Sequence, residues 1–226
     1  MEISRTINGL LERHVSGALP MPLDVLARAH LELNPINRSY VRDLEGLAAE
    51  NALHASWSAP GGPVSDASTS TAALDADAML ARVFETVPDT ASRKAVSPAR
   101  EPWMPQAISD VLGSEGVNWR GKMPGFKEMH LGTVEDCEMS LFWIKAGRAI
   151  PMHTHEGSEL TLVLDGGFSD GEGHYVRGDI SIADHNVDHR PVADDDGPCI
   201  GFAVTTDNLR LTGPIHSRIL DILGRG

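Results

Sequence analysis

The most constraining feature of this chain is a group of three histidines and one glutamate between residues 147 and 189. His153 and His155 are two residues apart, Glu159 follows four residues later, and His189 lies farther along the chain. In a β-strand, side chains two residues apart point to the same face, so His153 and His155 would share one space. Imidazole nitrogens and a carboxylate are suitable ligands for zinc, iron, nickel or manganese. The histidine pair taken alone also fits two polar residues on a solvated strand.

The positions of the glycines around this group favour the metal site. The order is Gly147-x5-His153-x-His155-x3-Glu159-x6-Gly166, followed by Gly173, Gly178-Asp179 and His189. This order resembles the two sequence signatures of the cupins. The resemblance implies one divalent metal ion held by His153, His155, Glu159 and His189, with zinc as the first choice and iron, nickel or manganese as alternatives. Arg177 departs from the signature, which often has proline there, and this departure affects a turn rather than a ligand.

Past residue 102 the sequence alternates short apolar stretches with glycine-containing turns. The expected strands are residues 127–131, 139–145, 160–164, 179–182, 199–205 and 209–211. Strands of about five residues at this spacing are typical of an all-β barrel or sandwich. Together with the cupin resemblance, they predict an all-β cupin barrel, also called a double-stranded β-helix, over residues 101–226.

The first 53 residues predict helices instead. Apolar residues at helical spacing indicate a first helix that ends before Gly17 and a second that begins near Pro22. A third helix is expected to begin at Asn34-Pro35, an N-cap followed by proline in the first turn. Its apolar stripe would consist of Ile36, Tyr40, Leu44 and Leu47. Such stripes can form the core of a helical bundle or a face for a partner's helices, and both uses stay open.

Two polar stretches predict the division into domains. Residues 56–73 are rich in serine, threonine, glycine and proline, which is typical of a linker, and a fourth helix is expected over residues 76–84. Residues 88–102 are polar again and contain three prolines. The predicted domains are therefore a helical domain, residues 1–90, and a cupin domain, residues 101–226. The predicted fold class is a multidomain α+β chain, an N-terminal helical bundle followed by the cupin barrel.

Three runs in the second half are similar to a narrower family, the ChrR anti-sigma factors. They are His153-Thr-His155-Glu-Gly-Ser-Glu159-Leu-Thr-Leu-Val-Leu, Gly167-Phe-Ser-Asp170 and His189-Arg-Pro191. The N-terminal helices agree with this resemblance. It implies a helical domain that binds and restrains an extracytoplasmic-function sigma factor. It also implies a cupin domain that releases the sigma factor under oxidative stress of the singlet-oxygen type.

The same resemblance implies a zinc motif in the helical domain, made of His-x-x-x-Cys-x-x-Cys and an earlier histidine. Here the matching residues are His30, Asn34 and Asn37, and Thr6 stands near the position of the earlier histidine. A neutral asparagine cannot replace a thiolate at a structural zinc site, so no zinc is expected in the helical domain. Asn34 can instead cap the third helix. His30 is then expected on a helix face near Tyr40 rather than at a metal.

Charge and composition argue against several other classes of protein. The net charge is −13 at pH 7, and residues 101–226 hold 20 acidic against 10 basic side chains. Such an acidic surface repels phosphate backbones, so direct nucleic-acid binding is not expected. The sequence has neither an apolar run of membrane-spanning length nor a signal-peptide pattern, which predicts a cytoplasmic protein away from membranes. Cys137 and Cys199 are expected to be packed small residues rather than redox sensors.

Three functions stay open at this point. The first is an anti-sigma factor whose closed, four-ligand metal site has a structural or sensing role. The second is a metal-dependent cupin enzyme of the dioxygenase type, which would need an open coordination position and for which no catalytic residue is assigned. The third is a sensor cupin whose helical domain has lost sigma binding together with its zinc ligands. A homodimer is compatible with each of them.

Overall fold

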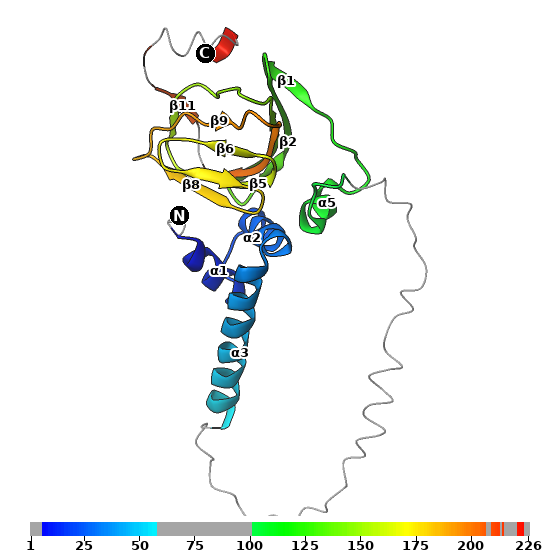
Figure 1. Ribbon diagram of the computed structural model, residues 1–226. Coiled ribbons are helices and arrows are strands. Elements are labelled where there is room, and N and C mark those ends of the chain that lie inside the picture. Colours follow the sequence, from blue (N-terminus) through cyan, green and yellow to red (C-terminus); the bar gives the residue numbers. More distant parts are fainter. Residues whose placement is uncertain (1–5, 58–100, 207–208, 213, 215–220, 224–226) are drawn as a thin grey trace, which may run out of the picture. The chain divides into compact units, whose positions relative to one another are not determined.

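The structure, a computed structural model, describes residues 6–57, 101–206, 209–212, 214 and 221–223. The chain divides into two compact units, Met1–Ala48 together with Pro98–Gly226, and Ala49–Ser97. The first unit contains N-terminal helices as well as the β-strands (Figure 1). The helix expected over residues 76–84 lies outside the described residues, and the domain boundary between residues 90 and 101 stays a prediction. Within the described ranges, no helix combines the length and apolarity needed to cross a membrane.

The described helices include the three expected near the N-terminus and one that was not expected. They are α1 (Ile7–Val15), α2 (Met21–Leu33), α3 (Pro35–Trp57) and α5 (Gln106–Leu112). Asn34 caps α3 as predicted, because its side-chain oxygen accepts a hydrogen bond from the backbone N–H of Asn37 at 3.0 Å. Helix α3 also includes Trp57, so the expected linker begins later than residue 56. Helix α5 escaped prediction because seven residues give too few turns for a periodic pattern.

Eleven strands follow within the described residues, and they form three antiparallel sheets. The strands are β1 (Arg120–Met123), β2 (Phe126–Val134), β3 (Cys137–Ile144), β4 (His153–His155), β5 (Ser158–Asp165), β6 (Gly167–Ser169), β7 (His174–Val176), β8 (Ile180–Asp184), β9 (Val192–Ala193), β10 (Cys199–Thr205) and β11 (Leu209–Leu211). The largest sheet has the order β1-β2-β3-β10-β5-β8, and the smaller ones are β11-β4 and β7-β6-β9. Every strand range expected from the sequence overlaps an observed strand. The strands outside those ranges, β1, β4, β6, β7 and β9, have only two to four residues.

The six-stranded sheet has two different faces, because side chains alternate along each strand. On β5, Glu159 and Thr161 line a cavity, whereas Leu160 and Leu162 are buried in the hydrophobic core on the opposite face. The same alternation places Ser140, Phe142 and Ala203 on the cavity side and Met139, Leu141, Phe202 and Val204 on the core side. One sheet therefore separates a cavity from an apolar core.

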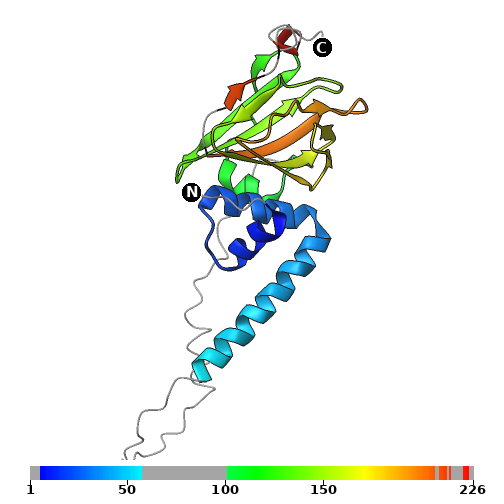
Figure 2. The same cartoon turned by 90° about the vertical axis from the view of Figure 1, so that its left-hand side faces the viewer.

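Helices α1 and α2 pack against the core face of this sheet (Figures 1 and 2). Leu10 of α1 and Leu23 and Leu26 of α2 are completely buried in the same core as Leu160 and Leu162. Burying a leucine side chain contributes roughly 1.5–3 kcal/mol. The apolar stripes of the first two helices thus serve a core shared with the β-sheet rather than a separate helical bundle.

Helix α3 differs from α1 and α2 in the exposure of its apolar stripe. Ile36 is 79% exposed and Leu47 is 57% exposed, while Val41 is buried. Tyr40 and Leu44 are partly exposed. Ile36 and Leu47 therefore do not belong to a packed core in this unit. Of the two uses expected for the stripe, this favours a face for a partner's helices.

A glycine in the left-handed region makes the turn between β5 and β6. Gly166 has φ of +66°, and a Cβ at this position would overlap the carbonyl oxygen of Pro198. Only glycine combines this backbone conformation with such a close approach. The signature glycine after Glu159 is thus required by the turn that ends β5.

Candidate metal centre

Four side chains that are separated in sequence converge on one point between the sheets. His153 and His155 come from β4, Glu159 comes from β5, and His189 is bridged to β4 by backbone hydrogen bonds with His153, each 3.0 Å long. One nitrogen or oxygen atom from each side chain lies within 4.8 Å of all the others. The three histidines are at most 4% exposed. We call these four residues the cupin cluster.

The local backbone explains how the cluster forms. His153 and His155 share a face of β4, as their spacing predicts. The chain then bends at residues 156–157, between β4 and β5, so Glu159 belongs to a different sheet from the two histidines. This bend lets the carboxylate reach the histidines from the six-stranded sheet.

Hydrogen bonds at the outer ring nitrogens determine which atoms face the centre of the cluster. The Nδ1 of His153 donates to the carbonyl oxygen of Pro151 at 2.8 Å, and the Nδ1 of His189 donates to the carboxylate of Asp170 at 3.2 Å. A neutral imidazole carries one proton, so each Nε2 then presents a lone pair. These two Nε2 atoms are 2.9 Å apart. Two facing lone pairs repel each other unless a cation lies between them, which favours a cation at this point.

The protonation of His153 and of Glu159 near neutral pH also suits a metal ion. Burial, reinforced by the charge of His189, lowers the pKa of His153 to about 4. Burial opposes ionisation of Glu159, yet the hydrogen bond with His155 and the electrostatic influence of the three neighbouring histidines hold the pKa of Glu159 below its ordinary value. Neutral imidazoles and an ionised carboxylate are the forms in which these groups bind metals.

The separations between the candidate ligand atoms fit a divalent ion. The Nε2 of His155 lies 3.0 Å from Glu159 Oε2 and 3.4 Å from His189 Nε2, and His189 Nε2 lies 3.8 Å from Glu159 Oε2. Tetrahedral zinc with bonds of about 2.0–2.1 Å separates its ligand atoms by roughly 3.3 Å. The cupin cluster is therefore able to bind a metal ion.

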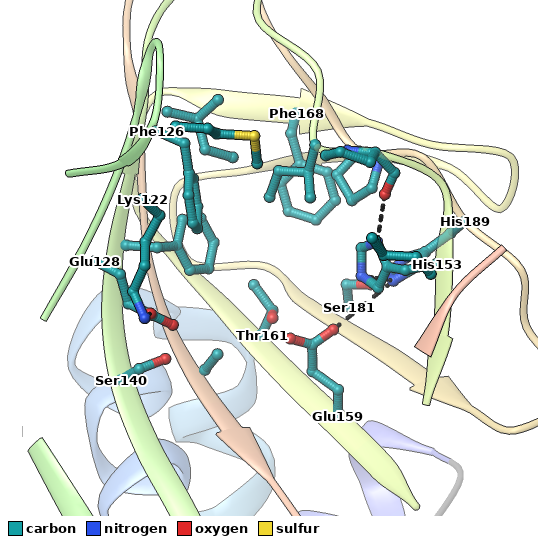
Figure 3. A pocket seen from close by; sticks show the side chains of 18 of the residues that line it. Lys122, Phe126, Glu128, Ser140, His153, Glu159, Thr161, Phe168, Ser181 and His189 are labelled. Atoms are coloured by element: carbon teal, nitrogen blue, oxygen red, sulfur yellow. Dashed lines mark hydrogen bonds and ion pairs between the residues drawn. The ribbon is translucent and has the colours of Figure 1, made fainter. Parts of the chain in front are cut away.

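The cluster opens onto a cavity of about 430 Å³. His153, Glu159 and His189 line one side of it, and Lys122, Phe126 and Glu128 lie opposite (Figure 3). The rest of the lining is mostly apolar and includes Phe142, Ile144, Ile150, Phe168, Leu211 and Ile222. The candidate metal site, which was expected to be closed, therefore lies next to a cavity large enough for a small organic molecule.

Sequence reasoning assigned no role to Asp170, although the residue lies in a run that carries the family resemblance. Its side chain is only 1% exposed and bonds to Nδ1 of His189. A carboxylate at this nitrogen orients the ring and strengthens Nε2 as a metal ligand. Asp170 and His189 are nineteen residues apart, so the sequence gives no indication of this contact. The turn that follows β6 brings the two side chains together in the fold.

A second contact missed by sequence reasoning joins the C-terminal part of the chain to the site. Arg190, the neighbour of His189, forms two hydrogen bonds with the carboxylate of Asp221, and Arg148 donates to the Asp221 carbonyl oxygen. The Asp221 side chain is 2% exposed. These contacts hold the adjacent Ile222 in the wall of the cavity.

The residues at the position of the helical zinc motif form a hydrogen-bonded group, which we call the helical cluster: His30, Asn34 and Asn37. His30 is 1% exposed, and its Nδ1 donates to the carbonyl oxygen of Gly178 at 2.7 Å. Its Nε2 can then accept from the side-chain amide of Asn37 at 2.8 Å. The Tyr40 hydroxyl donates to Glu12, and the expected position of His30 near Tyr40 stays a prediction. Both ring nitrogens of His30 are therefore used within the protein.

The remaining candidates lie apart from the cupin cluster. His185 is exposed, and Thr6 caps α1 by accepting a hydrogen bond from the backbone N–H of Gly9. Cys137 and Cys199 are buried, free cysteines. Burial raises the pKa of Cys199 to about 12, so its reactive thiolate form is scarce. These properties favour packed cysteines, as expected from the sequence.

The chain is similar to known proteins in sequence and in fold. The family model of the ChrR cupin-like domain matches residues 110–207. The anti-sigma-E factor ChrR of Cereibacter sphaeroides is 32% identical over 205 residues, which are 90% of this chain and 89% of that protein. The fold is similar to a chain in the crystal structure of Rhodobacter sphaeroides SigE in complex with the anti-sigma ChrR. That match has a TM-score of 0.64 and 28% identity, and it covers 91% of this chain and 99% of the other. The predicted fold class, helices followed by a cupin, is confirmed.

Proposed function

The chain belongs to the ChrR family of anti-sigma factors, and on this premise we propose that it binds and restrains an extracytoplasmic-function sigma factor. The observation that carries the proposal is that the similarity to ChrR extends over 90% of the chain, so it includes helices as well as the cupin. The partner is a protein rather than a nucleic acid, in keeping with the net charge of −13. Because sigma factors act on RNA polymerase, the proposed location is the cytoplasm.

The exposed stripe of α3 supports a role in binding the sigma factor. Ile36 and Leu47 are eleven residues apart, close to three turns of a helix, so both lie on one side of α3. Each is more than half exposed. A helix with apolar anchors on one face is a common means of binding partner helices. The proposed role explains this stripe without a zinc ion in the helical cluster.

We propose that the cupin cluster binds one divalent metal ion, zinc in the first instance, through His153, His155, Glu159 and His189. Bound metal would replace the repulsion between facing lone pairs with coordination, and it would fix β4 relative to β5. Oxidation of a ligand or of its surroundings, under stress of the singlet-oxygen type, would then loosen this connection. The two buried cysteines are poorly suited to the sensing role.

Contacts from the cluster to the helices support transmission of such a signal. On β5, Glu159 belongs to the cupin cluster while its neighbour Leu160 packs in the core shared with α1 and α2. A second contact runs from His30 of α2 to the carbonyl of Gly178, two residues before β8 begins. Strand β8 pairs with β5 beside Glu159. Movement of β5 or β8 would therefore reach α2 directly.

Transcription in a purified system tests the proposed function. Extracytoplasmic-function sigma factors of the host organism are each combined with core RNA polymerase and a cognate promoter, with and without this protein. We expect one of these sigma factors to be inhibited and to form a stable complex. Ile36→Asp and Leu47→Asp should each weaken the complex about tenfold. Ala49→Asp adds the same charge on the other side of α3 and should bind normally.

Two results would contradict the proposal. If none of the sigma factors is inhibited, the protein is a cupin without sigma binding. If Ala49→Asp weakens the complex as much as Leu47→Asp does, α3 does not present a specific binding face.

A further inference from the structure

The cavity beside the cupin cluster has the properties of a ligand-binding site. It is about 430 Å³, within the usual range for small-molecule sites, and three of the four candidate metal ligands line it. A bound ion held by His153, Glu159 and His189 would therefore be accessible from the cavity. We propose that this cavity binds an organic carboxylate with an apolar body, an inference that rests on the proposed metal site.

The wall of the cavity determines the apolar part of the ligand. Phe126, Phe142 and Phe168 contribute aromatic rings, and Ile144 and Ile150 contribute aliphatic side chains. Lys122 and Glu128 are the charged residues on the side opposite the cluster, and they pair with each other at 2.7 Å (Figure 3). Because this pair satisfies its own charges, the body of the ligand meets a surface that favours methylene or aromatic groups.

The charge at the other end determines the polar group. Three neutral imidazoles and one carboxylate leave a bound divalent ion with a net single positive charge. A buried charge without a partner is unfavourable, so an anionic group is the complement to this end of the cavity. Thr161 lies beside Glu159 in the lining, and its hydroxyl can donate to a ligand oxygen (Figure 3). A single carboxylate matches this charge, whereas an alcohol of the same length does not.

The C-terminal contacts indicate which part of the wall responds to the ligand. Ile222 lines the cavity and is 39% exposed, and its neighbour Asp221 is held by Arg190. Arg190 follows His189 directly in the sequence. A molecule in the cavity would thus contact a segment that is bonded to Arg190, the residue next to the candidate metal ligand His189.

Octanoate binding to the full-length, cobalt-loaded protein tests the inference. Cobalt is bound first, and its absorption spectrum is recorded while octanoate is added, with thermal unfolding as a second readout. We expect octanoate to change the spectrum and to raise the Tm. Affinity should change about fourfold for each methylene, so hexanoate should bind about fifteenfold more weakly. Octanol should bind at least tenfold more weakly than octanoate, because it lacks the charge.

A variant that fills the cavity gives an independent check. Ala203 is 4% exposed and lines the cavity, so Ala203→Leu should retain cobalt but lose octanoate binding. Thr133→Leu introduces the same side chain at an exposed position of β2 and should bind octanoate as the unaltered protein does. If Ala203→Leu does not fold, the comparison of hexanoate, octanoate and octanol on the unaltered protein still tests whether the cavity prefers a carboxylate with a long apolar body.

The outcomes separate this inference from the proposed function. An unaltered protein that binds cobalt but shows no response to octanoate retains the metal site and overturns the inference. Equal binding of octanol and octanoate also overturns it, because charge would then have no part. A protein that binds no cobalt overturns the proposed metal site and the inference together.

Discussion

The cupin cluster and the helical cluster each bury a histidine almost completely, but they satisfy its ring nitrogens in opposite ways. In the helical cluster, a carbonyl oxygen faces Nδ1 of His30 and an amide faces Nε2, so each contact joins a donor to an acceptor. In the cupin cluster, the Nε2 atoms of His153 and His189 face each other at 2.9 Å. Burial of a histidine therefore does not by itself indicate a metal ligand. Unmatched lone pairs that converge on one point do.

The difference also bears on the absence of cysteine at the helical zinc motif. Asn34 caps α3 and Asn37 contacts His30, so the two residues at the cysteine positions have structural roles of their own. Hydrogen bonds between neutral groups contribute about 0.5–1.5 kcal/mol each, far less than a structural zinc ion. The helical cluster is stabilised mainly by the apolar core around α2, whereas the cupin cluster would be stabilised by the metal ion that it is able to bind.

The largest expected effect is the loss of metal from the cupin cluster. His153→Ala removes one of four ligands and should reduce the bound metal from about one equivalent to near zero, since structural sites need all their ligands. The variant should also lose the stabilisation that added zinc gives the unaltered protein, about 2.7 kcal/mol at a hundredfold excess over the Kd and observed as a rise in Tm. Metal analysis of the purified proteins measures the first effect and thermal unfolding the second.

His185→Ala is the matched control, because His185 is an exposed histidine outside the cluster. It should retain the metal. If the unaltered protein binds two equivalents of metal and His153→Ala retains one of them, an ion is bound outside the cupin cluster. The distinction between a metal-binding cupin cluster and a hydrogen-bonded helical cluster would then no longer hold.

A smaller effect is expected from the residue that orients His189. Asp170→Asn keeps the shape of the side chain but weakens the charge-assisted hydrogen bond to Nδ1. Metal affinity should fall about 10–100-fold, as is common when such an outer carboxylate is replaced. Competition with a chromophoric chelator measures this change. Asp194→Asn serves as the control, because Asp194 contacts the exposed His174 instead, and unchanged affinity in both variants would exclude an orienting role for Asp170.

Much of the fold could be predicted from the sequence, because the patterns concerned are local. The apolar stripe around Leu23 and Leu26 predicts α2, and Asn34-Pro35 predicts the start of α3. The spacing of His153, His155 and Glu159 within seven residues predicts convergence of their side chains. In each case, neighbours along the chain carry the information.

The parts that could not be predicted depend on contacts between distant segments. Asp170 lies nineteen residues from His189, Asp221 lies 31 residues from Arg190, and His30 lies 148 residues from Gly178. A single sequence carries no signal for such pairs. The exposure of Ile36 is hidden for a similar reason, because the periodicity of a stripe does not show whether the fold or a partner covers it.

The next effect concerns the stability of the helical cluster. His30→Ala leaves the Gly178 carbonyl and the Asn37 amide without their partner, and the free energy of unfolding should fall by about 1–3 kcal/mol. Bound metal should stay at the level of the unaltered protein. Denaturant unfolding of the metal-loaded proteins gives the first value. His14→Ala removes a histidine that pairs with the partly exposed Asp24, and it should cost less than about 1 kcal/mol.

The metal content of His30→Ala tests whether His30 is a metal ligand. Loss of a metal equivalent in His30→Ala, with the cupin ligands intact, would make His30 a ligand and contradict its hydrogen-bonded role. Equal destabilisation by His14→Ala and His30→Ala would show that the contact with Gly178 contributes little.

The smallest expected effect is the pH dependence contributed by His30. Burial lowers the pKa of His30 below 6.5, and the hydrogen bond to Gly178 and the charge of Asp179 only partly offset this. Below pH 6.5 the unfolded chain therefore binds more protons than the folded chain, so stability falls as the pH drops from 6.5 towards the folded-state pKa. Above about pH 7.5 both states are neutral at this position and the contribution is constant. His30→Gln removes the titration, so the stability difference between the two proteins should change between pH 7.5 and 5.5 and be flat above pH 7.5. Because both proteins retain the cupin cluster, its own titration cancels in this difference. A difference that does not vary with pH would contradict this prediction, because it would show that folded His30 binds a proton as readily as unfolded His30. Protonation of Nε2 would then require the side-chain amide of Asn37 to turn its oxygen towards the ring.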